Sequence, residues 1–246
     1  MRKLILGAGF LAAAMTLTPA FARYVPRVAY YPQPAPAQNS IYISGDVGYG
    51  VLATPDVNLL DPDGYWIYQA SHSNSTISAG GDIGYRRAVS RSFLVGTEFG
   101  YDYNGRAKYD EDWFLPDFWG SDYTSYKVIS QDLHLLLTGT IMMPHGFNVF
   151  GKAGVARVDQ TLRITNQMPY VMPYVMTENR LVQYKPMAAA GIGYQFGVIN
   201  IYGQYSHIFG TNASNFSDFI DPETGNFTQV VSVDTFKLGM ALNIRV

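Results

Sequence analysis

From residue 40 onward, apolar and polar residues alternate along the chain with a period of two. In residues 41–51 the odd positions are apolar or glycine, whereas the even positions include Ser44 and Asp46. Such alternation predicts a β-strand with one apolar and one polar face. The pattern returns in seven more segments, at residues 77–86, 93–103, 130–141, 148–155, 187–196, 199–206 and 235–246. The sequence therefore predicts eight strands, each close to the 9–11 residues that cross a bilayer at a tilt.

The connections between these segments alternate between short and long. Short connections lie at residues 87–91, 143–146 and 197–198, and long ones span 52–74, 104–124, 161–183 and 210–232. A transmembrane barrel needs this arrangement, with short periplasmic turns and long extracellular loops. We therefore expect an all-β fold, an eight-stranded antiparallel up-and-down transmembrane β-barrel with four long extracellular loops. An even number of strands places both termini on the short-turn side.

The apolar face carries aromatic residues at both ends of the predicted strands, as membrane-interface belts do. They are Tyr85, Phe93 and Phe196 near the short turns, and Tyr49, Tyr101, Tyr103, Tyr205 and Phe236 near the long connections. The rival fold is a soluble lipocalin-like barrel, which is apolar inside and polar outside. We favour the membrane barrel because the polar face carries charged groups that can pair inside, while the apolar face is almost free of charge.

The first 22 residues have the pattern of a secretory signal peptide. Arg2 and Lys3 precede an apolar run at 4–17, and the small residues Ala20 and Ala22 supply a cleavage site. The run is too short to span a bilayer as a helix. Residues 23–39 are rich in proline and tyrosine, which favours an extended periplasmic linker, with a docking site for a partner as the alternative. The barrel is then expected at residues 40–246.

Composition narrows the possible function classes. Only 15% of the residues are charged, against about 25% in soluble domains, and the formal net charge of −2 excludes a basic nucleic-acid binder. The chain has no cysteine, which excludes disulfides, thiolate metal sites and cysteine nucleophiles. We expect no cofactor, no metal site and no catalytic residue.

These features together resemble the small outer-membrane barrels of Gram-negative bacteria, the OmpA/OmpX-like and opacity-like families. The likeness rests on the signal peptide ending at Ala22, the eight alternating segments, and the terminal strand from Phe236 to Val246. It implies a multi-pass barrel in the outer membrane, in contact with outer-membrane lipid and lipopolysaccharide. It also implies that the barrel-assembly machinery reads the last strand, which ends in Val246 where those families usually have phenylalanine. We expect a monomer.

The polar face of the predicted strands carries charged groups that would lie inside the barrel. They are Asp46, Asp82, Arg86, Glu98, Asp102, Asp132, His134, Lys152, Lys237 and Arg245. Side chains just fill an eight-stranded barrel, and buried charges must pair because an isolated one costs many kcal/mol. We expect a lumen charge network in which Glu98 pairs with Lys237 or Lys152. The resemblance implies an alternative, a narrow gated ion pore that opens when one pair changes partners.

A barrel enzyme of the lipid A deacylase kind, which uses Ser and His on the barrel wall, is a further alternative. Ser130, Asp132 and His134 share one strand face because they are two residues apart. Ser206 and His207 are adjacent and therefore point to opposite faces, whereas a catalytic Ser needs its base within hydrogen-bond reach. We therefore expect no enzyme.

The second long connection mixes acidic with aromatic residues, and exposed Trp and Tyr are typical binding anchors. The predicted surface-recognition residues are Tyr109, Asp110, Trp113, Phe114, Phe118 and Trp119. The alternative is an acidic solvated loop whose aromatic rings rest on the barrel rim. The expected function is a surface protein whose loops contact a host or matrix ligand, with the barrel as anchor or as a structural element of the envelope.

The third long connection contains a Met-Pro-Tyr-Val repeat that begins at Met168 and again at Met172, and Met176 follows. Three evenly spaced methionines suit a soft ion such as Cu(I). We favour repeat slippage in a variable surface loop instead.

Overall fold

The computed structural model describes residues 38–54, 67–115, 120–167, 174–212 and 228–246. Its elements are β1 (Ser40–Leu52), β2 (Ile67–Ser73), β3 (Ser75–Ala88), β4 (Phe93–Leu115), β5 (Gly120–Met142), the short 3-10 turn η1 (Pro144–Gly146), β6 (Phe147–Gln167), β7 (Tyr174–Phe196), β8 (Ile199–Ile208) and β9 (Val233–Arg245). Within these ranges, no helix is long and apolar enough to cross a membrane. The expected signal peptide, and all but the last two residues of the expected linker, lie outside the described residues.

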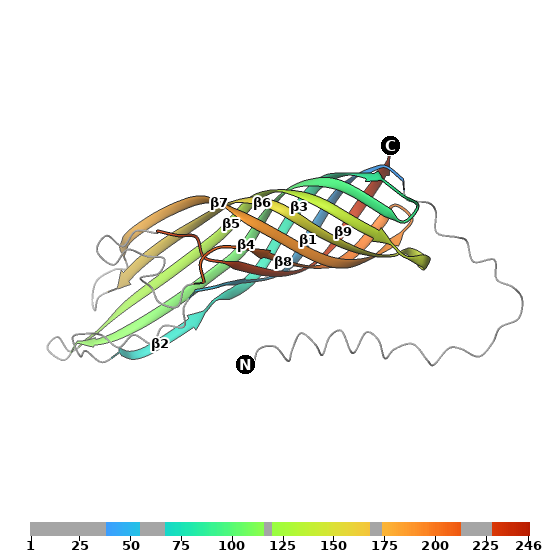
Figure 1. The fold of residues 1–246 in the computed structure, drawn as a ribbon. Coiled ribbons are helices and arrows are strands. Elements are labelled where there is room, and N and C mark those ends of the chain that lie inside the picture. The colour runs from blue at the N-terminus through green and yellow to red at the C-terminus, as the bar shows by residue number, and fades with distance from the viewer. Residues whose placement is uncertain (1–37, 55–66, 116–119, 168–173, 213–227) are drawn as a thin grey trace, which may run out of the picture. The chain divides into compact units, whose positions relative to one another are not determined.

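The strands close into an antiparallel ring (Figure 1). β1 pairs with both β3 and β9, and β4 pairs with β5, which leaves no free edge around the middle of the barrel. β2 and β3 are separated only by Asn74 and both pair with β4, so they act as one interrupted strand. The predicted eight-stranded up-and-down barrel is confirmed. The Val246 N–H donates to the Asn39 carbonyl at 3.2 Å, which places the C-terminus beside the start of the barrel at the short-turn end.

The apolar strand faces point outward and the polar faces point inward. Ile77, Leu137 and Leu238 are 71%, 69% and 72% exposed, whereas Glu98 and Asp132 are each 1% exposed. We call the ring of exposed apolar side chains the apolar band. A lipocalin-like barrel would have the reverse arrangement, so that alternative is wrong.

Two hairpins are much longer than predicted. β4 runs to Leu115 before β5 starts at Gly120, and β6 runs to Gln167 before β7 starts at Tyr174. Most of the expected loops at 104–124 and 161–183 are therefore strand, which corrects the sequence analysis. Beyond the apolar band most outward side chains are charged or polar, so the apolar alternation fades while the backbone hydrogen-bond ladder continues. We call these segments the hairpin extensions (Figure 1).

A bulge marks the point where β4 enters its extension. The register with β5 shifts between Tyr103 and Gly105. Gly105 has a φ of 102°, a left-handed conformation that glycine adopts readily. A Cβ at this position would lie 2.3 Å from the Thr76 Cγ2 atom, so only glycine fits. Because a bulge exchanges the two faces of a strand, Ala107 and Tyr109 now point inward.

The interior consists of two layers. A largely polar layer, which includes a small buried cluster of Tyr42, Phe150, Tyr202 and Ala241, fills the middle of the barrel and its short-turn half. An apolar layer fills the half nearer the long connections, and its largest members are Leu52, Val128, Leu136, Val158, Leu162, Met187, Ile208, Val230, Val231 and Val233.

Candidate functional site

Glu98, near the start of β4, lies at the centre of the polar layer. Its carboxylate accepts two hydrogen bonds from the Lys152 ammonium of β6, at 2.6 and 2.8 Å. The Tyr42 hydroxyl of β1 donates a third at 2.5 Å. The Arg86 guanidinium stacks over the Tyr42 ring, 3.9 Å from its centroid. Lys152 is one of the two partners that the sequence analysis names for Glu98.

Lys237, on β9, forms a second ion cluster with two aspartates. Its ammonium lies 2.5 Å from an Asp102 oxygen and 3.2 Å from an Asp46 oxygen, and all three side chains are at least 98% buried. The Tyr202 hydroxyl donates to the second Asp46 oxygen at 3.2 Å. One cation therefore joins β9 to β1 and β4 across the lumen.

His134, on β5, forms the third cluster. Its Nδ1 lies 2.9 Å from Asp132, its Nε2 lies 3.1 Å from Asp82, and Asp102 is 3.9 Å away. Ionised carboxylates only accept hydrogen bonds, so when both aspartates are ionised the two ring nitrogens donate and the ring is an imidazolium. Asn104 donates to the other Asp132 oxygen at 2.6 Å. The cluster is thus a closed set of charge-assisted hydrogen bonds.

Glycines on the lumen face make room for these clusters. A Cβ at Gly80 would lie 1.7 Å from an Asp102 oxygen, and one at Gly100 would lie 2.1 Å from Asp82 and 2.5 Å from His134. The sequence shows these glycines alternating with polar residues in 80–100. That they leave space for the ion clusters becomes clear only when the strands face one another across the lumen.

The apolar layer closes the barrel above the three clusters. Val230 and Val231, just before β9, are completely buried. Gln160 of β6 holds this segment in place: it donates to the Val231 carbonyl at 3.1 Å and accepts from the Val231 N–H at 3.0 Å. The end of the β8–β9 connection is therefore folded into the mouth of the barrel. Sequence reasoning placed this segment in an outer loop and missed its role.

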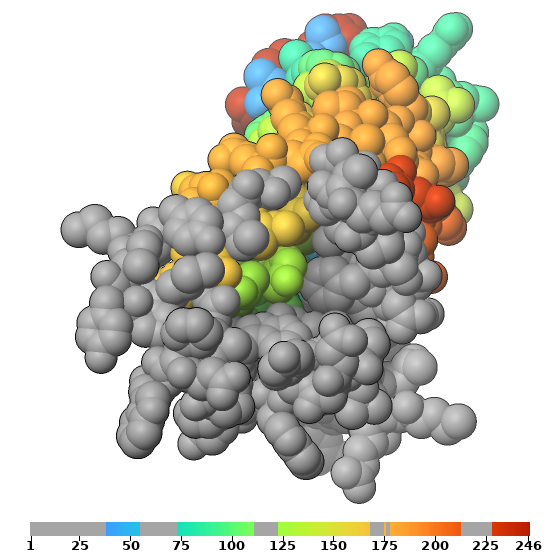
Figure 2. All heavy atoms as spheres, turned by 90° about the vertical axis from the view of Figure 1, so that its left-hand side faces the viewer, coloured from blue at the N-terminus to red at the C-terminus, as the bar shows by residue number. Residues whose placement is uncertain are grey.

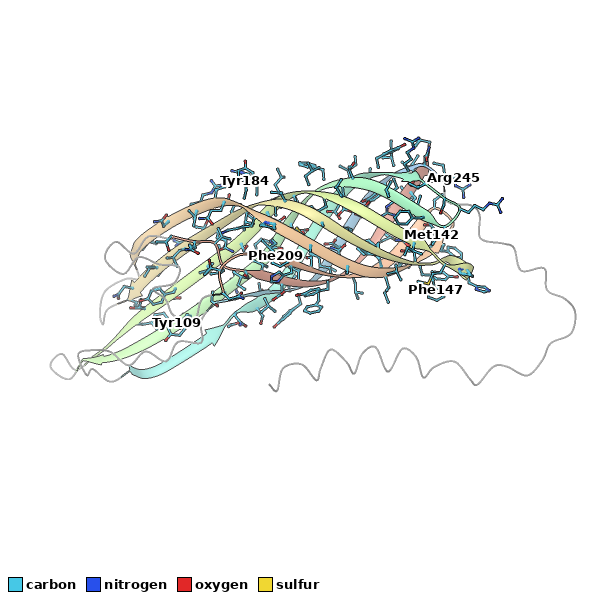
Figure 3. The ribbon with its side chains drawn as sticks, viewed as in Figure 1. Tyr109, Met142, Phe147, Tyr184, Phe209 and Arg245 are labelled. Carbon is cyan, nitrogen blue, oxygen red and sulfur yellow. The ribbon has the colours of Figure 1, made fainter. Side chains whose placement is uncertain are left out.

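Nine of the ten predicted lumen residues are buried, and Arg245 is the exception. It lies exposed at the end of β9, opposite Ser40, at the short-turn end of the barrel (Figure 3). The expectation that Arg245 joins the buried network is therefore wrong. Arg86 stacks on an aromatic ring, and no ion pair joins it to a carboxylate in the part of the chain that the structure describes.

Two buried trios, Asp82–Glu98–His134 and Asp102–Asp132–His134, have ligand atoms close enough to surround a metal ion. His134 belongs to both trios, and both of its nitrogens already bond to carboxylates.

Ser130 and His134 do not form the hydrogen-bonded pair that a hydrolase would need. The Ser130 hydroxyl accepts from Gln160 at 3.3 Å, while His134 contacts the aspartates.

The four predicted surface-recognition residues that the structure describes lie in strand β4, not in a loop. Tyr109 points into the barrel and is 5% exposed, which contradicts its expected role as an exposed anchor. Asp110 points outward and pairs with Lys108 at 2.7 Å. Trp113 and Phe114 lie on the backbone ladder of β4 opposite β5, but their side chains are outside the described set, as are Phe118, Trp119 and the Met-Pro-Tyr-Val repeat from Met168.

A cluster that the sequence analysis missed lies on the outer wall of β8 and β9. Asp234 accepts a hydrogen bond from the Tyr205 hydroxyl at 2.5 Å and lies 2.7 Å from the His207 Nδ1. The Phe209 ring packs edge-on against His207, with centroids 4.5 Å apart. The cluster resembles the base and orienter of a catalytic triad, but no described hydroxyl lies beside the second His207 nitrogen to serve as the nucleophile.

Known proteins with similar sequences or structures are outer-membrane β-barrels. The sequence model of the OmpA-like transmembrane domain matches residues 36–217. Among curated proteins, no sequence matches the chain. Similar solved structures include Ail, the attachment invasion locus protein of Yersinia pestis, with 13% identity and a TM-score of 0.41 over 84% of this chain and 99% of that one.

Two further structures are similar. Neisserial surface protein A has 10% identity and a TM-score of 0.36 over 85% of this chain and all of that one. The N-terminal barrel domain of Pseudomonas aeruginosa OprF has 13% identity and a TM-score of 0.37 over 84% and 98% of the two chains. Because the family model covers most of a closed, inside-polar barrel, the chain belongs to the OmpA-like transmembrane domain family and is an outer-membrane β-barrel.

Proposed function

We propose that this protein is a closed outer-membrane anchor that holds a rigid recognition surface outside the cell. The observation that carries the proposal is the pair of hairpin extensions. From Tyr101, in the outer aromatic belt, β4 continues to Leu115 in unbroken pairing with β5 apart from one bulge. Fourteen residues at about 3.3 Å each make an extension of roughly 45 Å along the strand.

The two extensions are joined into one sheet. β5 pairs with β6 as far as Tyr123 opposite Gln167, and β6 pairs with β7 as far as Asn166 opposite Tyr174. Figure 2 looks onto this end of the barrel, with β6 and β7 in yellow and orange. A ligand that binds such a preformed sheet does not have to order a flexible loop, which lowers the entropic cost of binding. The partner that we propose is a host or matrix ligand.

The filled interior supports an anchor over a pore. The Glu98–Lys152 pair, the Lys237 cluster and the apolar layer follow one another along the lumen. The cavity beside Glu98, lined among others by Tyr42, Arg86 and Lys152, has room for about one water molecule. A narrow gated pore would require both layers to rearrange. Bilayer recordings test this alternative, because steady conductance of porin size from the native protein would contradict the closed anchor.

The experiment shortens one extension without touching the barrel. Replacing residues 112–123 by Asn-Gly closes the β4–β5 hairpin directly after the paired residues Glu111 and Thr124. Replacing residues 164–177 shortens the β6–β7 hairpin after Arg163 and Glu178 and serves as the matched control. Heat-modifiable mobility on gels establishes that each variant is folded.

The readout is binding of the purified proteins to host cells and matrix proteins. We expect the first replacement to reduce binding at least about tenfold, as the loss of a central aromatic anchor does. The control should reduce binding less. If the native protein binds none of these surfaces, or if both shortened variants bind as it does, the recognition function is rejected.

A further inference from the structure

Among the side chains that the structure describes, the outer wall of the hairpin extensions carries more basic than acidic residues. Its outward-facing cations alternate with buried inward residues such as Ala107, Val128 and Leu162. The cations are Arg106, Lys108, Lys127, Arg157, Arg163 and Arg180, and the outward acids with described side chains on these strands are Asp110, Asp159 and Glu178. Apart from His207 on the outer face of β8, the described outer walls of the other strands carry no comparable set of basic residues.

Three of these cations form a row across neighbouring strands. Lys108 of β4 lies directly opposite Lys127 of β5, which lies directly opposite Arg163 of β6. Like charges in directly opposite positions destabilise a sheet. Asp110 neutralises Lys108 at 2.7 Å. Within the described residues, no ion pair joins Lys127 or Arg163 to an acid, although Glu178 lies opposite Arg163. The repulsion would be relieved by an anion bound between these two side chains.

The height of the row identifies the kind of anion. Arg157 lies opposite Leu133 and Tyr184, which mark the outer edge of the apolar band, and Tyr184 points away from the wall (Figure 3). Arg163 lies six residues farther along β6. At about 3.3 Å per residue and a tilt of about 40°, that is roughly 15 Å above the edge. A phospholipid headgroup layer extends only about 5–8 Å beyond the hydrocarbon.

We propose that Lys127 and Arg163, with Arg106 and Arg157 below them, bind phosphate groups of an outer-leaflet glycolipid of the lipopolysaccharide class. The side chains face the surrounding lipid because they are on the outer wall, and the distance above the band requires a headgroup that extends through sugars. The planar Arg163 guanidinium suits bidentate contact with phosphate, and Lys127 adds a point charge. The site is separate from the hairpin tips and does not depend on the proposed recognition function.

The test compares the double variant Lys127→Gln/Arg163→Gln with Arg87→Gln/Arg91→Gln, which removes two exposed cations at the short-turn end. The probe is lipopolysaccharide with a phosphorylated core, titrated against the purified folded protein. Each cation removed should weaken binding about fivefold, the effect of one basic residue near an anionic membrane surface. We therefore expect roughly 25-fold weaker binding for the double variant and less than about twofold for the control. Binding by the native protein should weaken as salt rises.

Three further probes decide the source of the phosphate. Dephosphorylated lipopolysaccharide should bind the native protein as weakly as the intact lipid binds the double variant, and equal binding of both lipids overturns the proposal. Phosphatidylglycerol vesicles should bind the native protein and the double variant equally well. If the double variant loses as much affinity for these vesicles as for lipopolysaccharide, the row binds ordinary phospholipid and the proposal is overturned. A loss confined to soluble heparin assigns the row to a free polyanion and also overturns the proposal. If the double variant does not fold, each single variant should show the fivefold effect.

Discussion

Removing Glu98 should destabilise the barrel far more than removing any surface charge. The variant Glu98→Gln leaves the Lys152 ammonium without its counter-ion at a site where both side chains are at least 96% buried. Breaking a buried pair from one side costs about 3–5 kcal/mol, because the remaining charge stays desolvated. Lys152→Met should cost a similar amount. The double variant Glu98→Gln/Lys152→Met should lose roughly 3 kcal/mol less free energy of unfolding than the sum of the two single variants. No lone charge remains in it, and the Tyr42 hydroxyl can still donate to the amide oxygen that replaces the carboxylate.

Urea unfolding of the protein in lipid vesicles measures these free energies. The matched control is Asp110→Asn, which breaks the partly exposed Lys108–Asp110 pair outside the lumen and should cost only about 1 kcal/mol. If Glu98→Gln costs no more than the control, or if the two single effects add, the network does not hold the barrel together. The reasoning that an ion-pair plug closes the lumen would then be refuted.

Three further outcomes follow from the same contacts. Gln160→Ala removes the hydrogen bonds that hold the end of the β8–β9 connection in the mouth of the barrel. Bilayer recordings of this variant should show channel openings that the native protein lacks, and unchanged recordings would mean that the apolar layer stays in place without Gln160. Gly100→Ala should lower the unfolding midpoint or block assembly, whereas Gly45→Ala, whose nearest neighbour would be 3.9 Å away, should be tolerated; equal midpoints would contradict the packing argument. Hydrogen bonds from Arg180 lower the pKa of Asp159 below its ordinary value of 3.8, so this pair stabilises the β6–β7 extension at neutral pH and stops doing so as the pH falls through that lowered pKa. The protection factors of the extension's amides, taken relative to the intrinsic exchange rate at each pH, should therefore fall on acidification more in the native protein than in Asp159→Asn, and an identical fall in both would contradict it.

The amino-acid pattern alone is enough to predict the barrel. Period-two alternation dictates which side chains share a face, and the alternation of short and long connections dictates antiparallel neighbours and the side on which the chain ends. The polar set on one face also identified nine of the buried charged residues. Arg245 was misplaced because alternation gives the face of a residue but not its burial: at the end of β9 its side chain is exposed, although its cross-strand neighbour Ser40 is buried.

How those residues combine depends on contacts that form only in the closed barrel. Asp234 and His207, or Glu98 and Lys152, are far apart in sequence and meet because strand register and barrel closure bring them together. The hairpin extensions were hidden for a different reason. Outside the membrane the ladder of backbone hydrogen bonds no longer needs an apolar outer face, so Arg106 and Lys108 can occupy strand positions that composition alone assigns to a loop. The sheet outside the membrane and the cations on its wall therefore follow from pairing between strands, which no local pattern records.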